Sequence, residues 1–166
     1  MEIREKTLGQ NHPLTATTYN NIACIYEDLG DYGKALEYCQ KALKIREEVF
    51  GQNHLLTATV YNNLGDVYTE ISCYDKALEC FQKALVITEG ALGQDHPSTA
   101  MSYNNLGDVY REMGNYDKAL ECFHESLSIF EKTLGHDHLS TAVTYNNLAS
   151  VYKIRISQLF IRQNRL

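Results

Sequence analysis

Four pairs of adjacent asparagines are the residues best suited to binding chemistry in this sequence. A side-chain amide carries a donor and an acceptor together, so it can hydrogen-bond the backbone of another chain without reading its side chains. Asparagine is also a poor helix former, costing about 0.5 kcal/mol relative to alanine, yet each pair lies in an otherwise helical segment. We therefore expect the first asparagine of each pair to bind a peptide backbone, with a hydrogen bond between helices as the alternative. These first asparagines are Asn20, Asn62, Asn104 and Asn146.

The second asparagine of each pair is expected to have a structural role. On a helical wheel drawn at about 100° per residue, Asn63 lies at the edge of the polar face, beside Val60 and Val67. Asn62 points more squarely away from the apolar arc. We expect Asn63 and its equivalents to hydrogen-bond an adjacent repeat. The equivalents are Asn21, Asn105 and Asn147.

Polar neighbours one and two turns beyond the asparagines are expected to select the side chains of a bound peptide. Most of them are acidic, so we expect a ligand with basic or polar side chains. The alternative is that these acids serve only solubility. The neighbours singled out are Asp66, Asp108, Thr69, Arg111, Glu70 and Glu112, with Glu27 and Asp28 at the equivalent places in the first repeat.

Neither a metal site nor a catalytic group is expected. The four histidines at residues 12, 54, 96 and 138 stand one per 42 residues, too far apart to share a metal through bonds of about 2 Å, so we expect them to form turns. The five cysteines include no CxxC pair, which favours free thiols, a reducing compartment and a cytoplasmic location. No nucleophile–base arrangement or phosphate loop can be argued from the spacings. We expect a non-enzymatic protein without a cofactor or metal.

Composition and charge limit the possible partners. The 166 residues are 44% hydrophobic and carry a net charge of −6, which argues against a disordered chain and a general nucleic-acid binder. No apolar run approaches the about 20 residues that span a bilayer, so no membrane partner is expected. The charge is unevenly distributed, because residues 153–166 sum to +4 and residues 1–152 to −10.

The asparagine pairs belong to a repeat of fixed length. The tyrosine before each pair returns every 42 residues, at 19, 61, 103 and 145, and such a period indicates a solenoid of stacked units. Each unit is expected to contain two helices. The expected organisation is a half repeat at 1–9, full repeats at about 10–51, 52–93 and 94–135, the first helix of a further repeat at 136–152, and a basic, helical extension at 153–166.

Glycines are expected to punctuate these helices. Gly30 and Gly114 suit the left-handed residue that ends a helix, whereas Ser72 holds that place in the middle repeat. Gly90, late in a second helix, should cost about 1 kcal/mol relative to alanine.

The motif YNNLGDVY followed by YDKALECF resembles the tetratricopeptide repeat. Gly65, Tyr68 and Ala77 match packing positions of that family, and the long period with the GxxHPxTA link is similar to repeats of kinesin light chain and nephrocystin-type proteins. The resemblance implies an all-α fold, a right-handed superhelix of antiparallel helix pairs whose first helices line a concave groove. It also implies a protein–protein interaction adaptor that binds an extended peptide in that groove. Asp66 and Asp108 stand where relatives that clamp acidic tails carry asparagine, so an acidic ligand is not expected.

Two alternatives to the adaptor stay open. The chain could be an assembly module that self-associates through its open solenoid ends, or a fragment of a larger signalling or motor-adaptor protein. The basic residues 153–166 also carry apolar side chains. They are expected either to prolong the last helix or to contact an acidic surface, the groove of another copy included.

Overall fold

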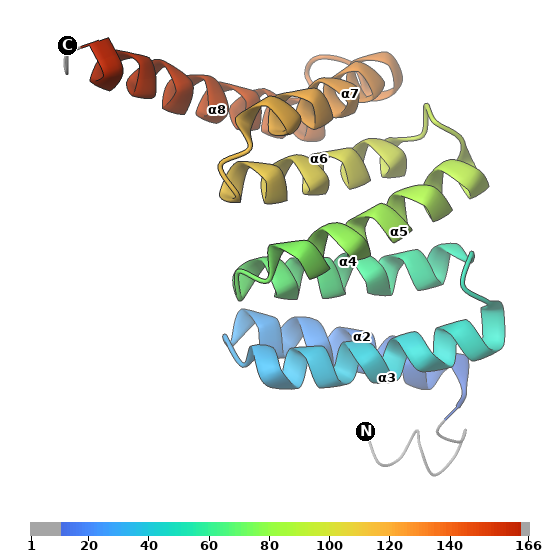
Figure 1. Cartoon of the computed structure of the whole chain (residues 1–166). Coiled ribbons are helices and arrows are strands. Elements are labelled where there is room, and N and C mark those ends of the chain that lie inside the picture. Colours follow the sequence, from blue (N-terminus) through green and yellow to red (C-terminus); the bar gives the residue numbers. More distant parts are fainter. Residues whose placement is uncertain (1–10, 164–166) are drawn as a thin grey trace. The chain divides into compact units, whose positions relative to one another are not determined.

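The part of the chain that the computed structural model describes, residues 11–163, is all-helical (Figure 1). The expected half repeat at 1–9 lies outside the described residues. The described helices are α2 (Pro13–Asp28), α3 (Tyr32–Phe50), α4 (Leu55–Glu70), α5 (Tyr74–Leu92), α6 (Pro97–Glu112), α7 (Tyr116–Leu134) and α8 (Leu139–Gln163). The chain divides after Ala91 into two compact units, the first holding α2 to α5 and the second α6 to α8. The prediction of an all-α fold built of sequential antiparallel helix pairs is confirmed.

The periodic histidines start the first helix of each repeat. The Nδ1 atoms of His12, His54 and His96 each accept the backbone N–H two residues onward at 3.1 Å. His138 caps α8 in the same way. A side chain in this position satisfies one of the amide groups that a helix start leaves without a partner. The prediction of turn-forming histidines is therefore confirmed, and their specific role is N-capping.

A threonine side chain makes a second hydrogen bond within the link between repeats. The hydroxyl of Thr57 donates to the carbonyl of Gly51 at 2.9 Å, and Thr99 does the same to Gly93. Gly51 has a φ of 86°, a conformation that side-chain-bearing residues rarely adopt. The Gly-x-x-His-x-x-Thr spacing of the sequence is thus one closed turn.

The turns inside the repeats also follow the sequence. Gly30 and Gly114 adopt left-handed φ angles of 72° and 74° at the ends of α2 and α6, as predicted. Ser72 takes the same conformation with a φ of 57°, although a non-glycine residue there is strained.

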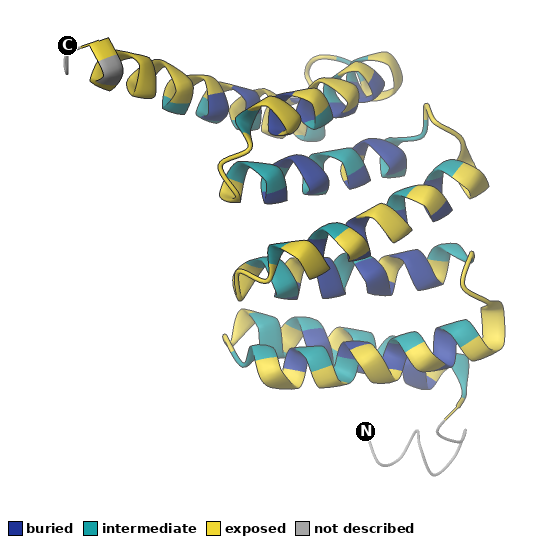
Figure 2. Cartoon of the chain, in the orientation of Figure 1, coloured by how far each residue is buried: buried dark blue, intermediate teal, exposed yellow. Residues whose placement is uncertain are grey.

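The apolar arc predicted for the first helices is the buried face (Figure 2). In α4 the residues Ala58, Tyr61, Leu64 and Val67 are all buried. The helix pairs approach closely where this arc carries glycine, because a Cβ atom at Gly65 would lie 2.6 Å from the ring of Phe81. Gly107 faces the ring of Phe123 in the same way. In the repeats that carry this glycine, an aromatic ring of the second helix therefore packs directly against the backbone of the first.

The last helix differs from the other first helices in length. α2, α4 and α6 have 16 residues each, whereas α8 has 25 and runs to Gln163. The residues that would form a turn and fold back in the other repeats instead prolong α8. Figure 1 shows the later part of α8 continuing beyond the end of α7.

Candidate functional site

In the first unit, the asparagine pairs of neighbouring repeats bond to each other. The Nδ2 atom of Asn63 on α4 donates to Oδ1 of Asn20 on α2 at 2.8 Å. The same nitrogen lies 3.4 Å from Sγ of Cys24, one turn further along α2. The second asparagine of one repeat is thus bound to the first asparagine of the repeat before it.

The second unit repeats this arrangement at longer distances. Nδ2 of Asn147 on α8 lies 3.4 Å from Oδ1 of Asn104 on α6 and 3.5 Å from Oδ2 of Asp108. The hydroxyl of Thr144 also donates to Asn104 Oδ1, at 3.4 Å. The pairing therefore occurs once within each of the two units.

These bonds confirm the structural role predicted for the second asparagines Asn63 and Asn147. They also show that the first asparagines Asn20 and Asn104 use their oxygens between helices, which was the alternative to a ligand role. Within the described residues, the amide nitrogens of Asn20 and Asn104 have no partner. A donor for a peptide carbonyl therefore remains at both positions.

The other two first asparagines have different surroundings. Asn62 on α4 is half-buried, and its Oδ1 atom is buried without a hydrogen-bond partner in the described part of the chain. Asn146 on α8 is exposed. The four predicted backbone-binding residues are thus present as one pair on α2 and α4 of the first unit and another on α6 and α8 of the second.

Asn63→Ala is expected to lower the free energy of unfolding by about 0.5–1 kcal/mol, because the lost hydrogen bond outweighs the better helix propensity of alanine. Asn21→Ala is the matched control, since Asn21 is exposed on α2, and it should raise stability by about 0.5 kcal/mol. Urea unfolding followed by circular dichroism measures both. Equal effects of the two substitutions would remove the structural role of Asn63.

Acidic side chains gather around Glu27 in the first unit. Burial of this half-buried carboxyl, together with the negative charges of Asp66, Asp28 and Glu70, raises its pKa to about 7. Asp66 and Glu70 are exposed on α4. The predicted acidic lining is therefore assembled here from two helices.

Two contacts modify this lining in ways that the sequence did not reveal. The hydroxyl of Tyr32 on α3 donates to a carboxylate oxygen of Glu70 at 3.2 Å. Thr69 donates its own hydroxyl to the carbonyl of Gly65 at 2.8 Å, inside α4. The sequence did not single out Tyr32, because its contact with Glu70 depends on how α3 lies beside α4. The one signal in the sequence is the position of Tyr32 directly after the turn residues Gly-Asp.

In the second unit, an arginine compensates the acids. Nη2 of Arg111 lies 3.1 Å from Oδ1 of Asp108 and 3.2 Å from Oε1 of Glu112. Burial raises the pKa of Asp108, and the charge of Arg111 acts against that rise. The surface around Asp108 is consequently less acidic than the surface around Glu27.

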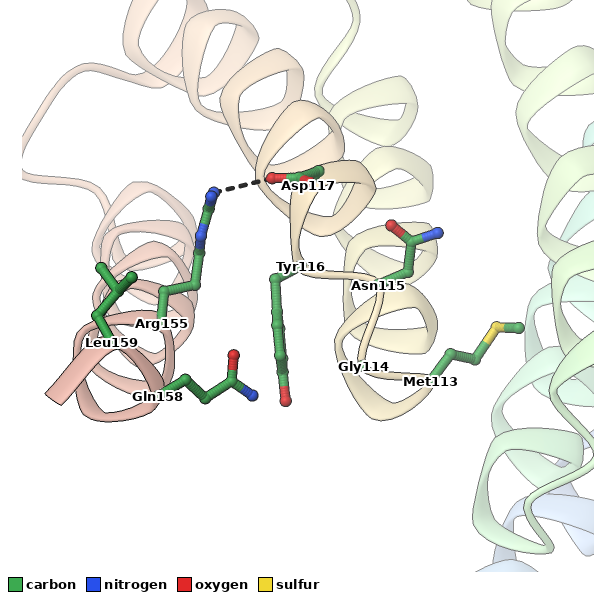
Figure 3. Close-up of a pocket in the computed structure, with 8 residues that line it drawn as sticks. All are labelled: Met113, Gly114, Asn115, Tyr116, Asp117, Arg155, Gln158 and Leu159. Carbon is green, nitrogen blue, oxygen red and sulfur yellow. Dashed lines mark ion pairs between the residues drawn. The ribbon is translucent and has the colours of Figure 1, made fainter. Parts of the chain in front are cut away.

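A separate cavity of about 480 Å³ lies in the second unit, on the turn between α6 and α7 (Figure 3). An ion pair bridges it, with Nη1 of Arg155 on α8 at 2.9 Å from Oδ1 of Asp117 on α7. Its charges neutralise each other, so the cavity offers no obvious ligand charge. The lining residues are Met113, Gly114, Asn115, Tyr116, Asp117, Arg155, Gln158 and Leu159.

Two further properties of the described residues bear on function. None of the helices from α2 to α8 combines the length and the hydropathy that crossing a bilayer requires. The five cysteines at 24, 39, 73, 80 and 122 are all free thiols.

Solved structures of repeat proteins are similar to this chain. BtubC (BKLC) from P. vanneervenii is 27% identical with a TM-score of 0.76, over 83% of this chain and 55% of that one. A kinesin light chain-like protein of Podospora anserina with nearly identical repeats is 24% identical with a TM-score of 0.78, over 99% of this chain and 79% of the other. The apo form of RapI is 24% identical with a TM-score of 0.73, over 90% of this chain and 54% of that chain. The chain thus spans about half the length of BtubC and of RapI.

Sequence comparison gives the family directly. No curated protein matches the chain. Two family models described as Tetratricopeptide repeat match it, one at residues 15–55 and the other at 58–123 and 102–156. The kinesin light chain-like neighbours agree with the long period of the repeats. The chain therefore belongs to the tetratricopeptide repeat family.

Proposed function

We propose that this protein is a non-enzymatic interaction module that binds an extended peptide with basic or polar side chains along its first helices. Tetratricopeptide repeats are in general protein–protein interaction modules, which supports the class of function. The single observation that supports this choice of ligand is the acidic cluster of Glu27, Asp66 and Glu70 in the first unit. The cluster lies on the same two helices as the hydrogen bond between Asn63 and Asn20.

The spacing of the groups in the first unit fits a peptide lying along the helices. Asn20 and Glu27 are seven residues apart on α2, which corresponds to about 10 Å along a helix axis. An extended peptide advances about 3.3 Å per residue, so roughly three peptide residues cover that distance. The amide nitrogen of Asn20 would hold a backbone carbonyl while the carboxylates hold side chains further along.

Electrostatics supports a cationic side chain at this cluster. Ionisation of Glu27 is opposed by burial and by the charges of Asp66, Asp28 and Glu70. A lysine or arginine placed among these groups would compensate several like charges at once. The second unit, where Arg111 already compensates Asp108, would instead accept uncharged polar side chains.

Replacing the exposed acids of the cluster tests the proposal. Asp66→Asn with Glu70→Gln is expected to weaken binding of a lysine- and arginine-rich peptide by about 3–10-fold, since exposed charge pairs contribute up to about 1 kcal/mol each. Fluorescence anisotropy with labelled basic, neutral and acidic peptides measures the preference. Affinity for the basic peptide should also fall as salt is added.

A second double variant separates the site from net charge. Asp75→Asn with Glu48→Gln removes the same charge from exposed positions on α5 and α3, and it should bind the basic peptide as the wild type does. A preference for acidic peptides, or equal losses in both double variants, would overturn the proposal.

The five free thiols support a reducing, cytoplasmic setting for this interaction.

A further inference from the structure

The last helix carries an exposed apolar seam at the spacing of a coiled coil. The spacing between its members alternates between three and four residues. Residues at this spacing form one stripe along a helix, and in coiled coils such a stripe packs against a partner helix. Tyr152, Ile156 and Leu159 are 44%, 53% and 58% exposed, and Figure 2 shows most of the later part of α8 as exposed. The α8 seam consists of Ala142, Tyr145, Ala149, Tyr152, Ile156 and Leu159.

The other repeats show that this face of a first helix receives a second helix. In α4, Tyr61 donates its hydroxyl to Glu47 of α3 at 2.7 Å, and Nζ of Lys83 on α5 lies 5.3 Å from the ring centroid. Tyr145 keeps the first contact, because its hydroxyl donates to Glu131 of α7. Tyr61 is 7% exposed, whereas Tyr145 is 41% exposed. Tyr145 therefore retains the contact with the preceding helix, and no following helix covers it among the described residues.

A second tyrosine of the seam shows the same difference. Lys76 of α5 lies over the ring of Tyr68 at 5.3 Å, and Lys118 of α7 over Tyr110 at 5.1 Å. Forty-two residues after Lys118 the sequence has Phe160, which is part of α8 itself. Within the part of the chain that the structure describes, Tyr152 is bonded from the α7 side, with its hydroxyl 3.2 Å from Nε2 of His124. The two tyrosines of the α8 seam are thus bonded to α7 on one side, and their other side is exposed among the described residues.

We propose that the α8 seam pairs with the α8 seam of a second copy of this chain, antiparallel and about a two-fold axis. In the register that overlaps the whole seam, Ala142 lies opposite Leu159 and Ala149 opposite Tyr152. The remaining pair is Tyr145 with Ile156. Two of the three pairs set alanine against a large side chain, and the third sets two large side chains against each other. Matching small residues with large ones favours close packing of two identical surfaces.

Charge selects the antiparallel direction. Residues 139–152 of α8 contain no charged side chain, whereas the charged residues of 153–163 are all basic, and one of them, Arg155, is paired with Asp117 of α7. A parallel pair would bring the two basic halves together along their length. The antiparallel pair lays each basic half against the uncharged half of the other helix. The seam covers 18 residues, about 27 Å of helix, which is enough for several layers of contact.

The oligomeric state of the intact chain tests this proposal. Analytical ultracentrifugation at protein concentrations of tens of micromolar is expected to show a dimer. Ile156→Glu with Leu159→Glu should give a monomer whose circular dichroism stays helical. Ile161→Glu is the matched control, because Ile161 is 54% exposed on α8 but lies off the seam, and it should remain dimeric. A monomeric wild type, or a dimer that survives the double substitution, would overturn the proposal.

Disulfide trapping tests the register without relying on disruption. The exposed Cys73 is first removed by Cys73→Ser. Ala149→Cys protein mixed with Tyr152→Cys protein should form a covalent heterodimer under mild oxidation, whereas Ala149→Cys alone should not form a homodimer. Self-cross-linking of Ala149→Cys would indicate a parallel pair, and no cross-link in the mixture would place the contact elsewhere, so either result contradicts the proposed pairing.

Discussion

Gly65→Ala is expected to lower the free energy of unfolding by up to about 2 kcal/mol, although alanine is the better helix former. The new Cβ atom would lie 2.6–2.8 Å from three ring atoms of Phe81, and that ring is only 2% exposed. Overpacking a closed core costs about 1–3 kcal/mol, from which about 1 kcal/mol of improved helix propensity is subtracted. Urea unfolding of the variant and the wild type measures the difference.

Gly90→Ala provides a control in the same repeat. Gly90 lies in α5, and a Cβ atom added there would meet nothing within 4 Å. Only the propensity effect then remains, so Gly90→Ala should stabilise by up to about 1 kcal/mol. If both substitutions stabilised the protein, the close approach of α4 and α5 would not constrain residue 65.

The first repeat indicates how the clash can be relieved. Its residues at the equivalent positions are Ala23 and Cys39, both buried, so a small side chain replaces the ring where the glycine is absent. Phe81→Leu should therefore reduce the cost of Gly65→Ala when the two are combined. A coupling of about 1 kcal/mol in the double-mutant cycle would show that the two positions are fitted to each other.

Features that depend on one helix at a time could be predicted from the sequence. The ends of α2 and α6 follow from Gly30 and Gly114, and the buried face of α4 follows from the spacing of Ala58, Tyr61 and Leu64. Local backbone conformation and helical periodicity determine both. The family resemblance rests on the same local features, which is why the all-α fold of sequential antiparallel helix pairs was predictable.

Features that depend on two helices could not be predicted with the same detail. The sequence places Asn63 at the edge of the apolar arc, but it does not show that the partner is Asn20. It includes Glu70 among the acids, but it does not show that Tyr32 of α3 donates a hydrogen bond to that side chain. Such contacts depend on the register between neighbouring helices, and a shift of one residue would exchange the partners.

Glu27→Gln is expected to stabilise the protein at alkaline pH and to leave it nearly unchanged at acidic pH. The folded state raises the pKa of Glu27 from 4.5 to about 7, so between these pH values it binds more protons than the unfolded chain. Stability must then fall as pH rises through this window and level off above it. Glutamine carries no ionisable group, so the variant escapes this loss.

The size of the effect follows from the shift and from solvent screening. Because Glu27 is only half-buried, we expect the variant to gain about 1–2 kcal/mol at pH 8, well below what the full shift would give. Urea unfolding at pH 5, 6, 7 and 8 measures the difference in stability between the variant and the wild type. Glu48→Gln controls for net charge, because Glu48 is exposed on α3.

This difference in stability should shrink when a basic peptide is added, because a bound cation stabilises the ionised carboxylate that the variant lacks. Parallel stability curves for the variant and the wild type would show that the acids around Glu27 do not act on it, and would remove the electrostatic basis for a cationic ligand.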